Sequence, residues 1–222
     1  MIRVRFSLPA PKEIVMAIQE IFSVPIYKIN LDLNVKELQS FCQWKSIDEY
    51  ESGKVLSNRG GYHSNNLNLK DAALQPLIKE IETHSSQFAE TFLSKNKQIL
   101  INMWFNINLY KDVNKAHAHP YCDIAGVYYV KTPDECGSIT FQHPAINLLE
   151  YYNINQPEEW NAYNSSIWRK SVSENKLYLF PGWLLHSVDP NENKTEERIS
   201  ISFNTRWRYR TSMEVRYRHL GE

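Results

Sequence analysis

Cysteine is scarce in this sequence, with three residues among 222. Cys42, Cys122 and Cys136 are odd in number and far apart, which argues against a disulfide framework. We therefore expect a reducing compartment, the cytoplasm. Residues 1–10 interrupt their apolar residues with arginine and proline, so they lack the apolar stretch of a signal peptide.

An excess of charge of one sign is also missing, because 25 Lys and Arg residues balance 25 Asp and Glu residues. A chain without net charge has no overall field that attracts nucleic acid or an anionic membrane, so neither is an expected partner. The arginines of 206–210, with Arg216 and Arg218, are locally basic, and we interpret them as the solvent-facing side of a strand end. No apolar run approaches the roughly 18 residues of a membrane span.

The sequence does contain the pattern of a mainly β domain with flanking helices. Apolar residues recur at helical spacing from Gln75 to about Leu93, and Pro76 suits the first turn of that helix. A short helix is expected after Asn34, which begins a capping box. Beyond residue 97 the period changes to two, in short segments separated by turns, which predicts a sandwich or barrel. These segments are 100–110, 126–131, 137–142, 175–180, 184–188 and 198–206.

The change of period also gives the expected domain organisation. Residues 1–98 are predicted to form an α/β region that packs on the core without being an independent domain. Residues 99–222 are predicted to form the β core. Within it, Ala145–Ser173 is rich in Tyr, Asn and Trp and is expected to be a long excursion between strands, of the kind that often lines a binding mouth.

The segment 100–110 has one wholly polar side. Its odd positions, such as Met103 and Phe105, are apolar, whereas Asn106 and Asn108 lie on the other face. Two interpretations stay open at this point. The segment belongs either to an antiparallel sheet with one solvated face or to a barrel whose polar interior holds a ligand.

Three of the seven histidines have the pattern of a metal site. His117 and His119 are two positions apart, so on an extended backbone both imidazoles project to the same side and can reach one ion. His186 ends the strand–turn–strand segment LYLFPGWLLH (177–186). Arg198 follows, with Ser200 on the same strand face, and an arginine can bind a carboxylate through two parallel hydrogen bonds.

This order of motifs resembles the 2-oxoglutarate- and Fe(II)-dependent oxygenases, most closely a group of such oxygenases found in bacteria and phages. The resemblance covers about residues 102–206, roughly half of the chain. Its motifs are HAHPYCDIAGVYYV (117–130), GSITF (137–141), LFPGWLLHSVDP (179–190) and RISISFN (198–204). The resemblance implies a double-stranded β-helix core, which is a cupin-like jelly roll, with Fe(II) as the metal and 2-oxoglutarate as the cosubstrate.

The resemblance also implies roles for individual residues. Arg198 matches the basic residue that pairs with the distal carboxylate of 2-oxoglutarate, and Ser200 assists it. Tyr129 matches a tyrosine that hydrogen-bonds the same carboxylate. Asn106 and Asn108 are expected to contact the cosubstrate or the substrate, although polar residues on a solvated strand would look the same.

The metal ligands depart from the usual pattern of the superfamily at one position. His117 and His186 match its two iron-binding histidines, but the carboxylate of the commoner His-x-Asp or His-x-Glu motif is replaced by His119. Three interpretations stay open. His119 completes a three-histidine site, or Asp123 supplies a carboxylate, or the metal has two protein ligands and His119 either supports those ligands or binds the substrate. Our predicted set of ligands is the three histidines.

The activity implied by the resemblance is that of a dioxygenase, an oxidoreductase. It consumes O2 and 2-oxoglutarate, hydroxylates a C–H bond of the substrate, and releases succinate and CO2. Two alternatives remain: a cupin-like enzyme whose three-histidine site does not use 2-oxoglutarate, and a catalytically silent barrel that binds a ligand. The sequence names no substrate, although residues 62–68 and 145–173 are where we expect it to bind. A homodimer is compatible with the sequence.

Overall fold

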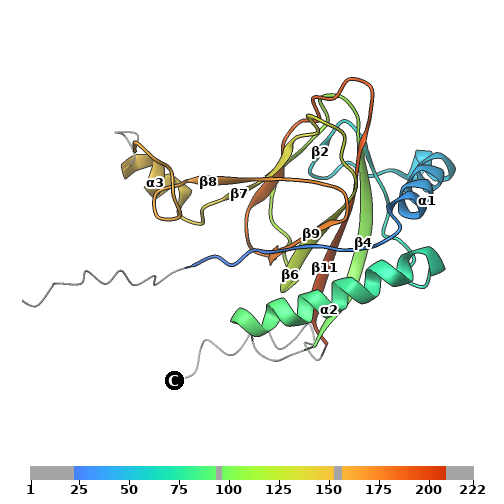
Figure 1. Ribbon diagram of the computed structural model, residues 1–222, viewed down its shortest axis with the longest axis horizontal. Coiled ribbons are helices and arrows are strands. Elements are labelled where there is room, and N and C mark those ends of the chain that lie inside the picture. Colours follow the sequence, from blue (N-terminus) through green and yellow to red (C-terminus); the bar gives the residue numbers. More distant parts are fainter. Residues whose placement is uncertain (1–22, 94–96, 153–156, 209–222) are drawn as a thin grey trace, which may run out of the picture.

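The computed structural model describes residues 23–93, 97–152 and 157–208. The predictions made for residues 1–10 and for Arg210, Arg216 and Arg218 lie outside these ranges. Within them the chain forms two antiparallel sheets, with helices against the larger one (Figure 1). No helix of the described part is long and apolar enough to cross a membrane.

The larger sheet has six strands in the order β1-β9-β6-β11-β4-β3. Its two longest strands, β4 and β11, pair along almost their whole length, with one register shift after Asn204. The bounds of the strands are Tyr27–Asn30 for β1, Lys176–Pro181 for β9, Ile124–Lys131 for β6, Arg198–Trp207 for β11, Gln98–Asn108 for β4 and Tyr62–His63 for β3.

The smaller sheet has five strands in the order β2-β5-β10-β7-β8. Its centre is the short strand β10, which pairs with β5 on one side and β7 on the other. The bounds are Asn58–Arg59 for β2, Val113–His117 for β5, His186–Val188 for β10, Ser138–Gln142 for β7 and Ile167–Ser171 for β8.

Two helices cover one face of the larger sheet, as Figure 1 shows for α1 and α2. Helix α1 (Val35–Asp48) begins as the capping box predicts, because the Asn34 side chain accepts a hydrogen bond from the Glu37 backbone. Helix α2 (Gln75–Phe92) buries Leu77, Ile81 and Phe88 against the sheet. The short helices η1 (Tyr50–Ser52) and η2 (Ala72–Leu74) connect these elements, and α3 (Ile146–Tyr152) follows β7.

The two faces of the larger sheet carry different side chains. The face toward the helices is apolar, with Met103, Phe105 and Ile201 fully buried. The opposite face looks toward the smaller sheet and combines an apolar cluster around Phe180 with polar residues of β4 and β11. The interior between the sheets is therefore partly polar, as the alternation at 100–110 predicts for a ligand-holding interior rather than for a solvated surface.

Local sequence patterns left several strands unpredicted. The stretch Ala145–Ser173 is not a single excursion, because it contains α3 and its residues Ile167–Ser171 form β8, which pairs with β7. Strands β2 and β3 were also missed, whereas β1 lies within the apolar, strand-like run of residues 22–33 in the sequence. All three strands lie within residues 1–98 and extend the two sheets. The division of the chain at residue 98 stays a prediction, and these strands show that hydrogen-bonded pairing crosses it.

Candidate metal centre and cosubstrate pocket

Three histidines converge at one end of the smaller sheet. His117 ends β5 and His186 begins β10, and the two are direct cross-strand partners. His119 lies in the loop after β5. One ligating nitrogen from each of the three side chains lies within 4.8 Å of the other two, so the group could hold a metal ion.

The second nitrogen of each ring fixes which atom faces the centre. The Nδ1 atoms of His117 and His186 lie 2.7 and 2.9 Å from the backbone oxygens of Lys115 and Leu184. Because a carbonyl oxygen only accepts, each Nδ1 carries the hydrogen and each Nε2 keeps its lone pair. This is the tautomer that a metal-binding histidine needs.

His119 follows the same rule with a different partner. Its Nδ1 lies 2.5 Å from Oδ1 of Asn204, near the end of β11. Its Nε2 is buried and has no hydrogen-bond partner among the described residues. A buried nitrogen acceptor without a partner is costly, and a metal ion would satisfy it.

Burial keeps all three imidazoles neutral. It lowers the pKa of His117, lowers that of His119 to about 4, and lowers that of His186 to about 3. The neighbouring imidazoles add to the shift at His119 and His186, because like charges would repel. Neutral imidazole is the form that binds a metal, so the site is ready for an ion at neutral pH.

The loop that carries His119 is tied to the turn between β9 and β10. The backbone N–H of His119 donates to the Gly182 carbonyl at 2.8 Å, and the Gly182 N–H donates to the Asp123 carbonyl at 3.0 Å. A Cβ atom at Gly182 would lie 2.4 Å from Sγ of Cys122. Glycine is therefore needed for this close approach.

Asp123, the alternative carboxylate ligand, has another role in the structure. Its Oδ2 accepts a hydrogen bond of 2.7 Å from the Trp207 backbone at the end of β11. Asp123 does not belong to the cluster of ligating atoms found among the described residues. The geometry thus supports the three-histidine interpretation over the one in which Asp123 binds the metal.

Arg198 is a fully buried cation that uses only part of its hydrogen-bonding capacity. It is 1% exposed, and its Nη1 donates to the backbone oxygens of Cys136 and Asp189. Its Nε and Nη2 have no partner in the described part of the chain. Burial lowers the pKa of the guanidinium, which nevertheless stays charged. A buried cation with two open donors is suited to a carboxylate ligand.

Strand register gathers the other predicted cosubstrate residues next to Arg198. Asn108 is its direct partner on β4, whereas Ser200 faces Asn106 on β4 and Tyr129 on β6. The hydroxyl of Tyr129 and the Oδ1 atoms of both asparagines are buried without a partner among the residues described. Burial raises the pKa of Tyr129, so the phenol keeps its hydrogen and can donate it.

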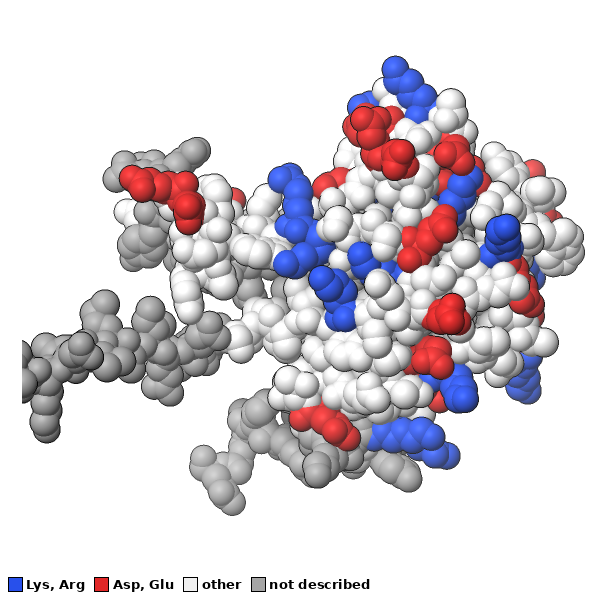
Figure 2. Space-filling view, viewed as in Figure 1, with Lys and Arg blue, Asp and Glu red and all other residues white. Residues whose placement is uncertain are grey.

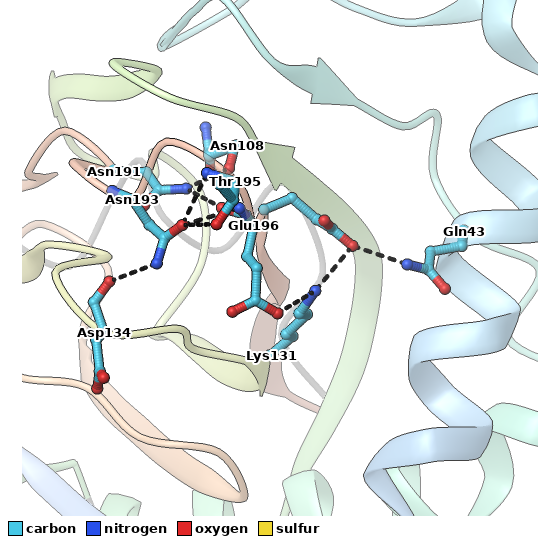
Figure 3. A network of polar contacts seen from close by, with 9 residues as sticks. Gln43, Asn108, Lys131, Asp134, Asn191, Asn193, Thr195 and Glu196 are labelled. Atoms are coloured by element: carbon cyan, nitrogen blue, oxygen red, sulfur yellow. Dashed lines mark hydrogen bonds and ion pairs between the residues drawn. The ribbon is translucent and has the colours of Figure 1, made fainter.

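The loop that leads into Arg198 is fixed by a network of polar contacts (Figure 3). The Asn191 amide donates to the Asn108 backbone oxygen at 3.0 Å, and the Asn193 amide donates to that of Asp134 at 3.1 Å. Lys131 of β6 lies 3.3 Å from Glu196 and from Glu197. The loop is thus held by β4, β6 and the β6–β7 turn, and this holds Arg198 in place.

Sequence patterns missed three residues that support the centre. Asn204 is the partner of His119, and Trp104 packs against His119 with ring centroids 5.6 Å apart. His63 of β3 stacks on Trp104 at 5.7 Å and is buried. The polar face of β4 and β11 signals that Trp104 and Asn204 point inward, but no local pattern places β3 beside them.

Comparisons with known proteins point to one family. Residues 102–204 match a family profile described as "Putative 2OG-Fe(II) oxygenase". The matched segment carries the three histidines of the cluster as well as Tyr129, Arg198 and Ser200. That description names Fe(II) as the metal and 2-oxoglutarate (2OG) as the cosubstrate of the family. No curated protein matches the chain.

Solved structures show that this chain shares its fold with distant proteins. A prolyl-4-hydroxylase of Pseudomonas putida has a TM-score of 0.60 at 12% identity, covering 84% of this chain and 94% of its own. HygX of Streptomyces hygroscopicus, with nickel and 2-oxoglutarate bound, has a TM-score of 0.54 at 12% identity, covering 85% of each chain. A Trichoplax adhaerens prolyl hydroxylase, in complex with a peptide fragment, has a TM-score of 0.53 at 14% identity, covering 81% of this chain and 82% of its own. These likenesses show the double-stranded β-helix fold of 2OG-Fe(II) oxygenases.

Proposed function

We propose that this chain is an Fe(II)- and 2-oxoglutarate-dependent dioxygenase that hydroxylates a C–H bond. Its iron is held by Nε2 of His117, His119 and His186. Arg198 pairs with the distal carboxylate of 2-oxoglutarate, with Tyr129 and Ser200 beside it. Asn106 and Asn108 line the same pocket.

One observation carries this proposal. Arg198 is fully buried with two open donors, on the same face of β11 as Asn204, the residue that holds His119. A three-histidine metal enzyme that does not use 2-oxoglutarate has no need for a buried, half-satisfied guanidinium near its metal. A silent barrel has no need for three neutral imidazoles with inward-facing Nε2 atoms. The combination fits a metal together with a dicarboxylate.

Each group of residues has a task in the reaction. Bound Fe(II) with 2-oxoglutarate and O2 supplies the oxidising chemistry, and CO2 and succinate are released. Arg198 neutralises the distal carboxylate, and the phenol of Tyr129 donates a hydrogen bond to it, so the cosubstrate is bound in one orientation. Phe180, whose ring lies 4.5 Å from that of His186, excludes water from the inner side of the histidine cluster.

The test is an anaerobic titration of the Fe(II)-loaded protein with 2-oxoglutarate. We expect a visible metal-to-ligand charge-transfer band, because the keto acid chelates the iron. Arg198→Met is expected to retain iron and to weaken the band by lowering the affinity for 2-oxoglutarate. Iron bound without any band would overturn the proposal and favour the three-histidine enzyme that needs no keto acid.

Histidine variants separate the remaining interpretations. His117→Ala and His186→Ala are expected to lose iron, whereas His84→Ala, on helix α2 outside the cluster, should retain it. His119→Ala should also lose iron if all three histidines are ligands. A His119→Ala variant that keeps both iron and the band would establish a two-histidine site.

The pocket around Arg198 is tested by turnover. If Arg198→Met no longer forms succinate from 2-oxoglutarate in the presence of O2, the pocket is required for the reaction.

Two narrower predictions concern the setting of the protein. We propose a cytoplasmic location, which the buried free thiols of Cys42 and Cys136 support. We also propose that the chain forms a homodimer, and the molar mass from light scattering on the purified chain tests this. The balanced charge supports our expectation that nucleic acid is not a partner.

A further inference from the structure

A second cavity lies between the sheets, on the other side of Phe141 from the histidines. Its volume is about 700 Å³, and it opens between β8 and the segment that leads into β1. In Figure 1 the β7–β8 arm and this segment extend from the sheets in the same direction. Its wall is mostly apolar, with contributions from Val24, Ile26, Phe141, Trp168, Tyr178 and Leu184.

The cavity is separated from the metal centre by a thin aromatic wall. Phe141 lines the cavity and is the cross-strand partner of His186, and their ring centroids lie 6.4 Å apart. Phe141 is also packed against Phe180, with ring centroids 5.1 Å apart. Both phenylalanines are buried, so the cavity is a compartment distinct from the cosubstrate pocket around Arg198.

Among the described residues that line the cavity, two lysines are the basic or acidic side chains beside His143, and the remaining polar ones, such as Gln142, are uncharged. Lys28 of β1 and Lys170 of β8 both line the cavity. Neither forms an ion pair with a described residue. Partial burial and the charge of Lys28 lower the pKa of Lys170, whose Nζ lies 4.5 Å from the centroid of the Trp168 ring. Figure 2 shows Lys and Arg side chains gathered over this part of the surface.

These features define the chemistry of a ligand. An apolar wall of this size favours an apolar body, because transfer of apolar surface from water is favourable. Two like charges without a carboxylate partner leave a positive potential at the cavity, which an anionic group would neutralise. The wall offers too few cations for a polyanion such as a nucleotide.

We propose that this cavity is a binding site for an elongated apolar molecule with one anionic end, of the kind represented by a medium-chain carboxylate. The carboxylate lies between Lys28 and Lys170, and the apolar chain lies along Tyr178, Phe141 and Leu184. The site needs neither metal nor 2-oxoglutarate. Its existence is therefore independent of the oxygenase activity.

The test is calorimetric titration of the metal-free protein with octanoate and with its uncharged analogue, octanamide. We expect octanoate to bind and octanamide to bind at least about tenfold more weakly, because the charge-assisted contacts are lost. Lys170→Glu should weaken octanoate binding by a similar factor. Lys79→Glu, which makes the same charge change on helix α2, should leave the binding unchanged.

Several outcomes would overturn the site. They are an absence of octanoate binding, equal binding of octanamide, or equal weakening by Lys170→Glu and Lys79→Glu. A second variant, Leu184→Gln, addresses the apolar end, because it places a polar amide against the bound chain. It should weaken octanoate more than acetate, and equal effects on both would contradict the proposed orientation. Circular dichroism of each variant confirms that it is folded.

Discussion

The imidazole of His119 is held differently from its two neighbours. His117 and His186 bond to backbone oxygens close to them in the sequence, whereas His119 depends on the side chain of Asn204. A backbone oxygen cannot be removed by a substitution, whereas the side-chain oxygen of Asn204 can. A substitution at Asn204 therefore changes how His119 is held without changing His119 itself.

Replacing Asn204 tests whether His119 binds the metal. Asn204→Leu removes the acceptor that fixes the ring, and loss of such a partner typically lowers metal affinity about 10–100-fold. Asn204→Asp keeps an acceptor and should retain most of the affinity. Competition with a coloured chelator measures both variants. Unchanged affinity in Asn204→Leu would mean that His119 is not a ligand.

The lowered histidine pKa values predict a pH dependence of stability in the metal-free protein. Unfolded histidines bind protons below about pH 6.5, whereas folded His119 and His186 stay neutral down to about pH 4 and 3. The unfolded state therefore binds more protons in this window, and stability falls as the pH falls from 6.5 toward 4. Urea unfolding with a chelator present, at pH 7 and pH 5, measures the loss. His186→Gln should show a smaller loss, and an equal loss would contradict the assignment.

Among the connecting elements, the β6–β7 turn has the most direct effect on the cosubstrate pocket. Gly137 has a φ of +84°, and a Cβ there would lie 2.6 Å from the Pro190 oxygen and 3.1 Å from Nη1 of Arg198. The Cys136 oxygen, one residue earlier, accepts from the same Nη1. The turn thus supports the arginine through its backbone.

Gly137→Ala is expected to damage both stability and cosubstrate binding. The strained φ and the close contacts should lower the unfolding free energy by about 1–3 kcal/mol, and displacement of Arg198 should raise the Kd for 2-oxoglutarate. Denaturant unfolding and the charge-transfer titration measure the two effects. The control is Gly53→Ala, away from the pocket at a φ of −57°. Its added Cβ would lie 2.9 Å from the Tyr62 ring, so it should lower stability without changing the affinity for 2-oxoglutarate. A variant with normal 2-oxoglutarate affinity would show that the turn does not position Arg198.

For the molecule as a whole, the sequence predicted what depends on local periodicity. The spacing of Leu77, Ile81 and Phe88 predicted α2, and the alternation around Asn106 predicted β4. The sequence did not predict the pairing of strands that are far apart along the chain. Nothing at Asn58 or His63 specifies a partner strand some 50 residues away. For the same reason the sequence indicated His117 and His186, but not the contact between His119 and Asn204.

Metal binding should raise the stability of the whole domain. An ion that binds only the folded state contributes about 2.7 kcal/mol at a concentration 100-fold above its Kd. We expect Fe(II), under anaerobic conditions, to raise the Tm of the wild-type protein and to leave that of His117→Ala unchanged. Scanning calorimetry with and without metal measures the shift. An equal shift in both proteins would place the ion elsewhere.

The three histidines connect the two sheets of the molecule. His117 and His186 belong to the smaller sheet, whereas His119 is tied through Asn204 to β11 of the larger one. An ion bound by all three acts as a cross-link between the layers, and the loop it closes spans the residues between His119 and His186. Separation of the sheets then requires release of the ion. Amide hydrogens of β5, β10 and β11 should consequently exchange together, and more slowly once metal is added, even though β5 and β11 share no ladder.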